Sequence, residues 1–432
     1  TLGSGASQSG FGRTGTVDWQ TSSIKTSTFT AANGEGYFAN TSGGAFTMNL
    51  PAGTAGNIVS VVDYTNTFQT NALTVAPNGS QKIGGVAAAT TLTTEGQSVT
   101  LVYVDDTEGW KNVQDSTSNL TGSAFITASG GTITTSGDCK IHTFTGPGTF
   151  TVCAISASCA TNNIVSYVVV AGGGGGGGSH DAPDNRAGGA GGAGGYREVK
   201  NPVTPYTASP LDGYPSAPNR VTVTATSFPI TVGAGGAGGR RSSNNSANGS
   251  NSIFSTITSA GGGRGGMAIG GPVGFPGCGG DGGSGGGGSG GGAGTASVKG
   301  DGNTPPTSPA QGFDGGTGSG PGGGAGGGGA TAAGGNACSS DGGPGGAGAT
   351  SSINATPTAR AGGGGGAGAS GGGMAGGAGG GGPGGGSNTA GTAGTTNTGG
   401  GGGGAGWGPD GSTNSLGGSG GSGIVIIRYK FQ

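Results

Sequence analysis

Hydrophobic and polar residues alternate with a period of two through the first 118 residues, a pattern typical of β-strands with one buried face. Clusters of Gly, Pro and Asn mark the turns, and nothing here predicts a helix longer than one turn. The strand-like stretches are 36–39, 45–50, 57–64, 72–76, 98–104 and 110–113. We therefore expect residues 1–118 to form an antiparallel β-sandwich or barrel, with Ile58, Val75 and Leu101 among its core residues.

A second group of strand-like stretches precedes a long glycine-rich region, and one more ends the chain. The stretches are 132–135, 140–145, 149–155, 164–170 and 424–431. The last is apolar and β-branched but has only glycine before it, so it needs a partner far away in the sequence. We expect residues 119–170 and 424–432 to form one small β-sheet closed by the C-terminal strand, with 171–423 inserted between its strands.

The inserted region is dominated by glycine. Of the 118 glycines in 432 residues, 22 lie in 1–170 and 96 in 171–423. Residues 258–423 contain only ten large apolar side chains, too few for a hydrophobic core. One interpretation is disorder, because chain entropy of about 1–2 kcal/mol per residue is opposed by little burial. The other is a bundle of polyglycine II helices that bond to one another, since glycine lets such helices approach closely.

The arrangement of the glycines favours the ordered bundle. They come in blocks such as 172–178, 187–195 and 362–373, and Ala187, Ala190 and Ala193 recur at the three-residue period of this helix type. Turn-like inserts separate the blocks, whereas a flexible linker needs neither blocks nor such inserts. We expect a polyglycine II bundle with variable loops over residues 171–423.

Composition and charge exclude several classes of protein. The 16 Lys and Arg residues against 18 Asp and Glu, with no basic stripe, argue against a nucleic-acid partner. No apolar run reaches the roughly 18–20 residues of a membrane span. The first residue is Thr1, and no signal sequence follows it, so we expect a cleaved N-terminus or the distal part of a larger protein.

Candidate catalytic and metal-binding groups are sparse. The two histidines are His142, which lies in a predicted strand and is expected to have a structural role, and His180, which with Asp181 and Asp184 is better explained as a polar loop tip than as a cation site. No Ser/His/Asp or paired-carboxylate pattern stands out, and the glycines after 164–170 lead into no helix, as a dinucleotide site would require. We expect no enzymatic activity and no cofactor.

The five cysteines leave two alternatives open. They are Cys139, Cys153, Cys159, Cys278 and Cys338, and none forms a C-x-x-C pair, which argues against zinc. Cys139 and Cys153 flank the turn at 146–148 almost symmetrically, so a cross-strand disulfide between them is possible. The alternative is that all five are free thiols that serve as small apolar residues.

Aromatic residues are the candidate contact residues of the glycine-rich region. Tyr206 and Tyr214 lie in a Pro-rich insert, and Phe275, Phe313 and Trp407 lie between glycine blocks. Aromatic side chains in loops add contact area at low entropic cost, so we consider these five as receptor-binding residues. The alternative is that they pack across the ends of the blocks or against the sheet.

Three segments, 139–152, 164–174 and 420–429, resemble the glycine-rich domain family found in tail fibres and adhesins of tailed phages. The stretches 35–40, 46–51 and 109–110 are similar to β modules of structural proteins in marine tailed phages. The resemblance implies a polyglycine II sandwich that carries variable, receptor-binding loops. Cys139 and Cys153 are not part of the family pattern, and no binding residue carries over, because the loops vary.

The resemblance leads us to expect an adhesin on the virion surface that binds a bacterial polysaccharide or outer-membrane protein and contacts other virion proteins at its N-terminus. A second reading is a structural tail-fibre or head-fibre spacer that binds no receptor. A third, an ice-binding protein, predicts a flat face of regularly spaced Thr or Ala, against which the irregular inserts argue. Phage fibres are commonly trimers, and oligomerisation steadies small polar domains, so we predict a homotrimer.

Overall fold

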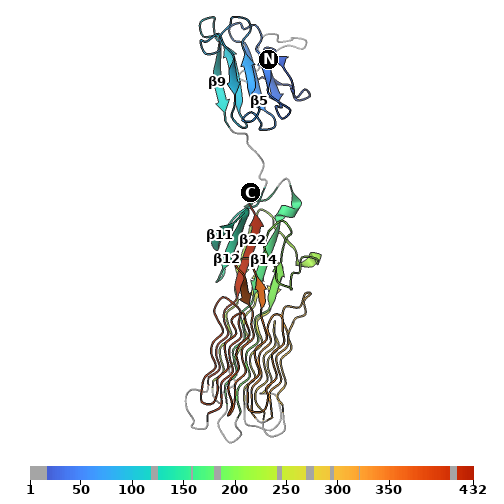
Figure 1. Ribbon diagram of the computed structural model, residues 1–432, viewed down its shortest axis with the longest axis vertical. Helices are drawn as coiled ribbons and strands as arrows, with labels where there is room; N and C mark the ends of the chain where they lie inside the picture. Colours follow the sequence, from blue (N-terminus) through green and yellow to red (C-terminus); the bar gives the residue numbers. More distant parts are fainter. Residues whose placement is uncertain are drawn as a thin grey trace, which may run out of the picture. The chain divides into compact units, whose positions relative to one another are not determined.

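The computed structural model describes residues 17–117, 125–156, 159–179, 186–240, 246–268, 277–291, 296–320, 322–408 and 416–432. The chain divides into two compact units, Thr1–Thr121 and Gly122–Gln432, which are described separately below (Figure 1). The fold is mainly β, and the described helical segments are two short 3-10 turns, η1 (Ala160–Asn163) and η2 (Ala217–Asn219). Neither has the length that crossing a membrane requires.

The N-terminal unit contains two open sheets. The first has the strand order β1 (Asp18–Trp19), β3 (Glu35–Ala39), β5 (Ile58–Asp63), β8 (Ser98–Tyr103) and β9 (Trp110–Ser116). The second has the order β2 (Phe29–Thr30), β4 (Phe46–Asn49), β6 (Leu73–Ala76) and β7 (Thr90–Leu92). Alternate residues of both sheets, such as Leu101 in β8 and Met48 in β4, form one buried core. The unit is therefore a β-sandwich, as predicted, and not a barrel.

The predicted antiparallel arrangement of this unit is wrong in part. β1, β3 and β5 are parallel neighbours, and so are β2, β4 and β6; only the pairs β5–β8, β8–β9 and β6–β7 are antiparallel. The reason is the path of the chain, which alternates between the two sheets from β1 to β6. Each strand therefore reaches its neighbour in the same sheet through a crossover, and crossovers produce parallel pairs.

The second unit contains another pair of sheets. One has the order β10 (Thr127–Ser129), β13 (Gly148–Ala154), β17 (Ser227–Thr231), β18 (Ser252–Phe254) and β19 (Ile257–Ser259). The other has the order β11 (Thr132–Ser136), β12 (Cys139–Phe144), β22 (Ile424–Lys430), β14 (Ile164–Val170) and β15 (Tyr196–Val199), and β16 (Val221–Thr222) also pairs with β14. A separate hairpin joins β20 (Ala349–Ser351) to β21 (Thr358–Arg360).

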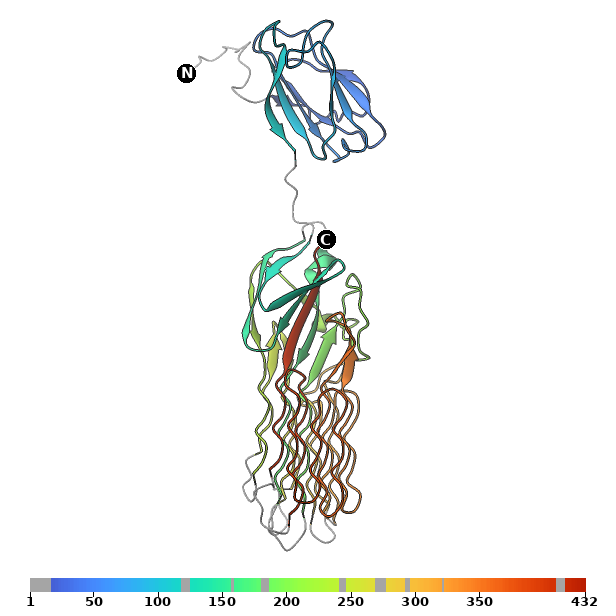
Figure 2. The ribbon, with the colours of Figure 1, turned by 60° about the vertical axis from the view of Figure 1, so that its left-hand side comes forward.

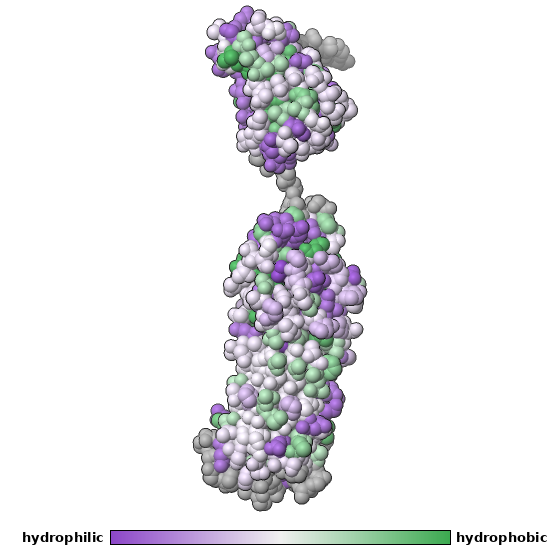
Figure 3. All heavy atoms as spheres, viewed as in Figure 1, coloured by the Kyte–Doolittle hydropathy of each residue, from purple (hydrophilic) through white to green (hydrophobic). Residues whose placement is uncertain are grey.

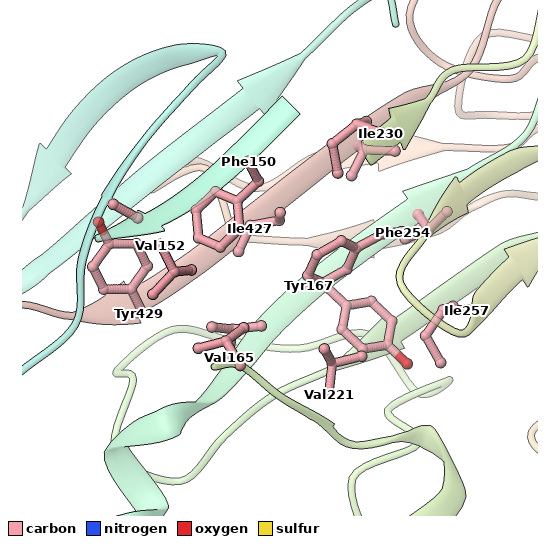
Figure 4. Close-up of a cluster of buried hydrophobic side chains, with 14 of the residues drawn as sticks. Phe150, Val152, Val165, Tyr167, Val221, Ile230, Phe254, Ile257, Ile427 and Tyr429 are labelled. Carbon is pink, nitrogen blue, oxygen red and sulfur yellow. The ribbon is translucent and has the colours of Figure 1, made fainter. Parts of the chain in front are cut away.

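The C-terminal strand lies in the middle of its sheet, with β14 on one side and β12 on the other (Figure 1). Ile426 is paired with Val168, and Ile427 with both Tyr167 and His142, all of them buried. Figure 4 shows Ile427 among core side chains that come from both sheets. The prediction that the final strand closes this sheet with the strands before the glycine region is therefore confirmed.

Two details differ from the expectation. Strands β15 to β19 come from within the region expected to form only the bundle, so the sheets take up part of it. β12 and β13 do not pair with each other but lie in different sheets, with Cys139 buried and Cys153 exposed. The possible disulfide between them is therefore not formed, and all five cysteines are free thiols.

Candidate functional site

Beyond the sheets, the glycine-rich segments run side by side to the far end of the second unit (Figure 2). The N–H groups of residues 172–177 donate to three neighbouring segments in turn, so that groups three residues apart donate to the same segment. The N–H groups of 172 and 175 donate to 247–250, those of 173 and 176 to 418–421, and those of 174 and 177 to 189–192, at N···O distances of 2.8 to 3.0 Å. The carbonyl groups of 172–178 accept hydrogen bonds from three other segments, namely 236–239, 262–268 and 402–405. This three-residue period is the one expected of an extended helix with three residues per turn, in which every third backbone group faces the same neighbour.

The segment 187–195 lies in an equivalent environment. It donates hydrogen bonds to segments 260–266, 322–328 and 399–405, and it accepts them from segments 171–177, 284–290 and 364–367. The residues of both segments are buried although they carry no side chain larger than a methyl group. Their backbone polar groups are satisfied by neighbouring backbone, so this interior is ordered by hydrogen bonds rather than by side-chain packing.

Steric exclusion explains why glycine is needed there. A Cβ atom at Gly191 would overlap the carbonyl oxygen of Gly174, and one at Gly401 would overlap that of Gly191. In both cases the glycine Cα–H points at a neighbouring C=O group, a contact that adds a weak attraction. Alanine is accepted at the third position of the repeat, as at the fully buried Ala190. The glycine content therefore reflects close packing and not flexibility.

At the surface of the bundle, the three-residue period places some residues toward the interior and others toward solvent. Thr389, Thr392 and Thr395 are exposed, whereas a Cβ at Gly391 or Gly394 would overlap a backbone carbonyl of segment 399–407. Figure 3 shows side chains of mixed polarity along one face of the bundle. Side chains can vary only on such outer rows and in the turns that join the segments.

The structure describes three turns at the end of the bundle farthest from the strands: 338–341, 370–373 and 386–389, here called the distal turns (Figure 2). Hydrogen bonds between neighbouring segments fix these turns: the N–H of Gly372 donates to the carboxylate of Asp341, in the turn 338–341, at 3.1 Å. The N–H of Asn388 donates to the carbonyl of Trp407 at 2.8 Å. Ser339 and Asn388 have φ values of 54° and 58°, a left-handed conformation that glycine would also adopt.

Only one of the five predicted contact aromatics is placed by the structure beside these turns. Trp407 is half-buried next to Asn388, and its indole N–H has no hydrogen-bond partner among the residues that the structure describes. Phe313 is 41 % exposed, but it lies toward the sheet end, because Gln311 two residues earlier accepts a hydrogen bond at 2.8 Å from the N–H of Tyr196 in β15. Phe275 lies outside the described residues.

Tyr206 and Tyr214 pack against the sheet end of the unit. The Tyr206 ring lies against the core, 5.4 Å from the Arg428 guanidinium, and its hydroxyl donates to the carbonyl of Val199. Burial raises the pKa of Tyr206 far above its usual value. Tyr214 is half-buried with the Arg220 guanidinium 4.5 Å above its ring. Both tyrosines therefore hold the Pro-rich insert in place, the alternative considered from the sequence.

A buried charged network lies at this sheet end and was missed by sequence reasoning. The Glu198 carboxylate accepts hydrogen bonds from the Tyr196 hydroxyl, the Ser209 N–H and the Ser351 hydroxyl at 2.9, 2.9 and 2.6 Å. Burial, together with the charge of Glu198, raises the pKa of Tyr196. The only signal in the sequence was the charged pair Arg197 and Glu198 between Tyr196 and Val199 in β15. The network joins the Pro-rich insert and the β20–β21 hairpin to the sheet.

Of the two histidines, only His142 lies among the residues that the structure describes. His142 is fully buried: its Nδ1–H donates to the carbonyl of Gly130 at 2.7 Å, and its Nε2 accepts from the Tyr429 hydroxyl at 3.1 Å. Burial lowers the pKa of His142, which suits the structural role expected from the sequence. His180, with Asp181 and Asp184, lies outside the described residues. In the described part of the chain, no three His, Cys, Asp or Glu residues gather where they could hold a metal ion.

Comparison with known proteins agrees with the architecture of the second unit. No curated protein matches the chain. The family described as "Glycine-rich domain" matches residues 143–430, from β12 through the whole bundle to the final residue of β22. Because this match spans more than half of the sequence, the chain belongs to the glycine-rich domain family.

Proposed function

We propose that the protein is a tail-fibre or adhesin protein on the virion surface of a tailed phage. In this proposal it binds a bacterial surface polysaccharide or outer-membrane protein through the distal turns. The phage assignment rests on the resemblance of segments 139–152, 164–174 and 420–429, and family membership supports the architecture it implies.

One observation carries the binding role: the bundle separates a close-packed interior, where added side chains collide with backbone, from turns that can accept other side chains. The interior tolerates almost no side chain beyond a methyl group, so changes in sequence are confined to the outer rows and the turns. The distal turns are anchored by backbone hydrogen bonds to their neighbours, which lowers the entropy that binding would cost. A rigid base under variable turns is typical of recognition surfaces.

The test uses the fluorescently labelled full chain and a panel of intact bacterial strains. In one variant Ser339, Ser340, Ser387 and Asn388 become glycine, which removes four side chains while the turns keep their backbone course. The matched control replaces Asn354, Ala355 and Thr356 by glycine in the turn between β20 and β21, where Ala355 has a φ of 71°.

We expect saturable binding of the wild-type chain to a few strains, weakened at least about tenfold in the distal variant and retained in the control. Equal binding by the wild-type chain, the distal variant and the control would show that the receptor contacts a surface other than the distal turns. Binding to no strain, with both units folded, would contradict the adhesin role and favour a spacer. The predicted homotrimer stays a prediction, and sedimentation equilibrium of the same chain tests it.

A further inference from the structure

The N-terminal unit carries three aromatic side chains on the outer face of its first sheet. Residues of odd number in β3, such as Tyr37, point into the core, so Phe38 points outward. Trp19 is paired with Gly36 in the same outward set, and Tyr64 directly follows β5. Trp19 is 40 % exposed and Tyr64 53 % exposed, unusually open positions for residues of this size.

The three rings form a continuous row. The ring centroids of Trp19 and Phe38 are 5.3 Å apart, and those of Phe38 and Tyr64 are 6.2 Å apart. The neighbouring outward residue of β5, Val62, is paired with Phe38 and continues the apolar surface. Figure 3 shows hydrophobic residues at the surface of this unit among polar ones. The row is longer than one ring of a sugar, which favours a polymer as ligand.

The row is held in place before any ligand arrives. A Cβ atom at Gly36 would collide with the Trp19 ring and with Val17, so the indole packs directly on the glycine backbone. The N–H of Gln20 donates to the carbonyl of Gly36 at 2.8 Å, which fixes the strand that carries Trp19. Little side-chain entropy is therefore lost when a ligand stacks on this indole.

Charge decides between possible ligands. Residues 17–117 contain eight Asp and Glu against three Lys and no Arg, so nucleic acid and anionic membrane surfaces are repelled. Exposed hydroxyl groups of Thr21, Ser22 and Ser23 follow Trp19 along the chain, and Thr65 follows Tyr64. An aromatic face flanked by neutral hydroxyl groups fits the C–H face and the hydroxyl groups of an uncharged sugar.

We propose that Trp19, Phe38 and Tyr64 form a binding platform for an uncharged polysaccharide, on which consecutive sugar rings stack. This platform lies on the other unit from the distal turns and does not depend on the function proposed for them.

The test measures binding of the full chain to insoluble chitin and cellulose, two uncharged polysaccharides, with immobilised heparin as an anionic control polymer. The variants are Trp19→Ala, Tyr64→Ala and their combination. The matched control is Val113→Ala on β9 of the same sheet, where the side chain is 60 % exposed. Because Trp110 is fully buried and Trp407 half-buried, quenching of tryptophan fluorescence by acrylamide chiefly reports Trp19.

We expect binding to at least one neutral polymer, accompanied by protection of Trp19 from acrylamide. Each single variant should weaken binding about tenfold and the double variant about a hundredfold. The control variant Val113→Ala should bind as the wild-type chain does, and the wild-type chain should not bind heparin. Binding to none of the neutral polymers, or equal binding by the double variant, would overturn the proposal. Protection of Trp19 that increases with protein concentration alone would also overturn it, in favour of a second copy of the chain.

Discussion

The two units of this protein are ordered by different forces. The N-terminal unit buries side chains such as Phe68, Leu73 and Leu101 between two sheets, and its stability comes mainly from apolar area removed from water. The bundle of the second unit buries glycine, and each of its inner segments is bonded through backbone groups to neighbours on all sides.

This difference shows what replaces a hydrophobic core. A backbone hydrogen bond contributes only about 0.5–1.5 kcal/mol net, and glycine loses more chain entropy on folding than any other residue. The bundle can offset that entropy only if nearly every N–H and C=O group finds a partner. Its tolerance to substitution is therefore opposite to that of the sandwich: added atoms are damaging in the bundle, and removed atoms are damaging in the core.

A large loss of stability is expected from adding one methyl group inside the bundle. Gly191→Ala places a Cβ atom against the carbonyl oxygen of Gly174, so the two segments must separate and lose hydrogen bonds. We expect a loss of about 3 kcal/mol or more in the stability of the second unit, measured by chemical denaturation. Ala237→Ser, on an exposed row, is the control and should change stability by less than about 0.5 kcal/mol. Equal stability of the two variants would contradict the close packing.

In the N-terminal unit, removing side-chain atoms from the core should be the damaging change. Phe68 is fully buried there, and Phe68→Ala removes most of its side chain, at a cost of about 3–5 kcal/mol. Because the two units are separate compact bodies, only one of two thermal transitions should move. A matching downward shift in the transition of the second unit would show that the units do not unfold independently.

A calorimetric difference should also separate the units. Exposing apolar surface raises the heat capacity of unfolding, and exposing polar backbone lowers it. We expect the heat capacity change per residue to fall below the usual value of about 12–15 cal/mol/K for the second unit, but not for the first. The shift caused by Phe68→Ala assigns the two transitions. Equal values per residue would mean that the bundle is stabilised like an ordinary core.

The smallest effect concerns pH. The folded second unit favours neutral His142, whose pKa burial lowers from 6.5, whereas the unfolded chain takes up a proton near that value. The unfolded state therefore binds more protons as pH falls below about 6.5, and the stability supplied by this residue is lost in that direction. His142→Phe should make the stability of the second unit less dependent on pH in this range. An unchanged slope would show that His142 is not responsible.

The sequence was sufficient to predict most of the strands outside the glycine-rich region, but not strands β15 to β21 within it and not all of the strand pairings. The apolar final strand and its lack of a local partner led to the pairing of β22 with β12 and β14. The period-two pattern of residues 1–118 identified most strands of the N-terminal sandwich. That pattern is the same for parallel and antiparallel neighbours, so the crossovers between the two sheets could not be read from it.

For the candidate site, the repeat of the bundle was predictable from the sequence, but the positions of the aromatic side chains were not. The repeat of Ala187, Ala190 and Ala193 indicated a three-residue period, which the hydrogen bonds between segments display. The positions of the aromatic residues were less predictable, because a ring in a Pro-rich insert can face solvent or fold back. Tyr206 folds back because Arg428, more than two hundred positions away, lies beneath its ring.

Amide hydrogen exchange over residues 172–177 and 187–195, resolved to single residues, tests the central claim most directly. If backbone hydrogen bonds between segments order the bundle, these glycine amides should exchange only through unfolding of the whole second unit. Their protection should then match that of β14 and β22 and fall together with it in Gly191→Ala. Exchange of the glycine amides at the rate of an unstructured peptide, while β14 and β22 stay protected, would contradict the account.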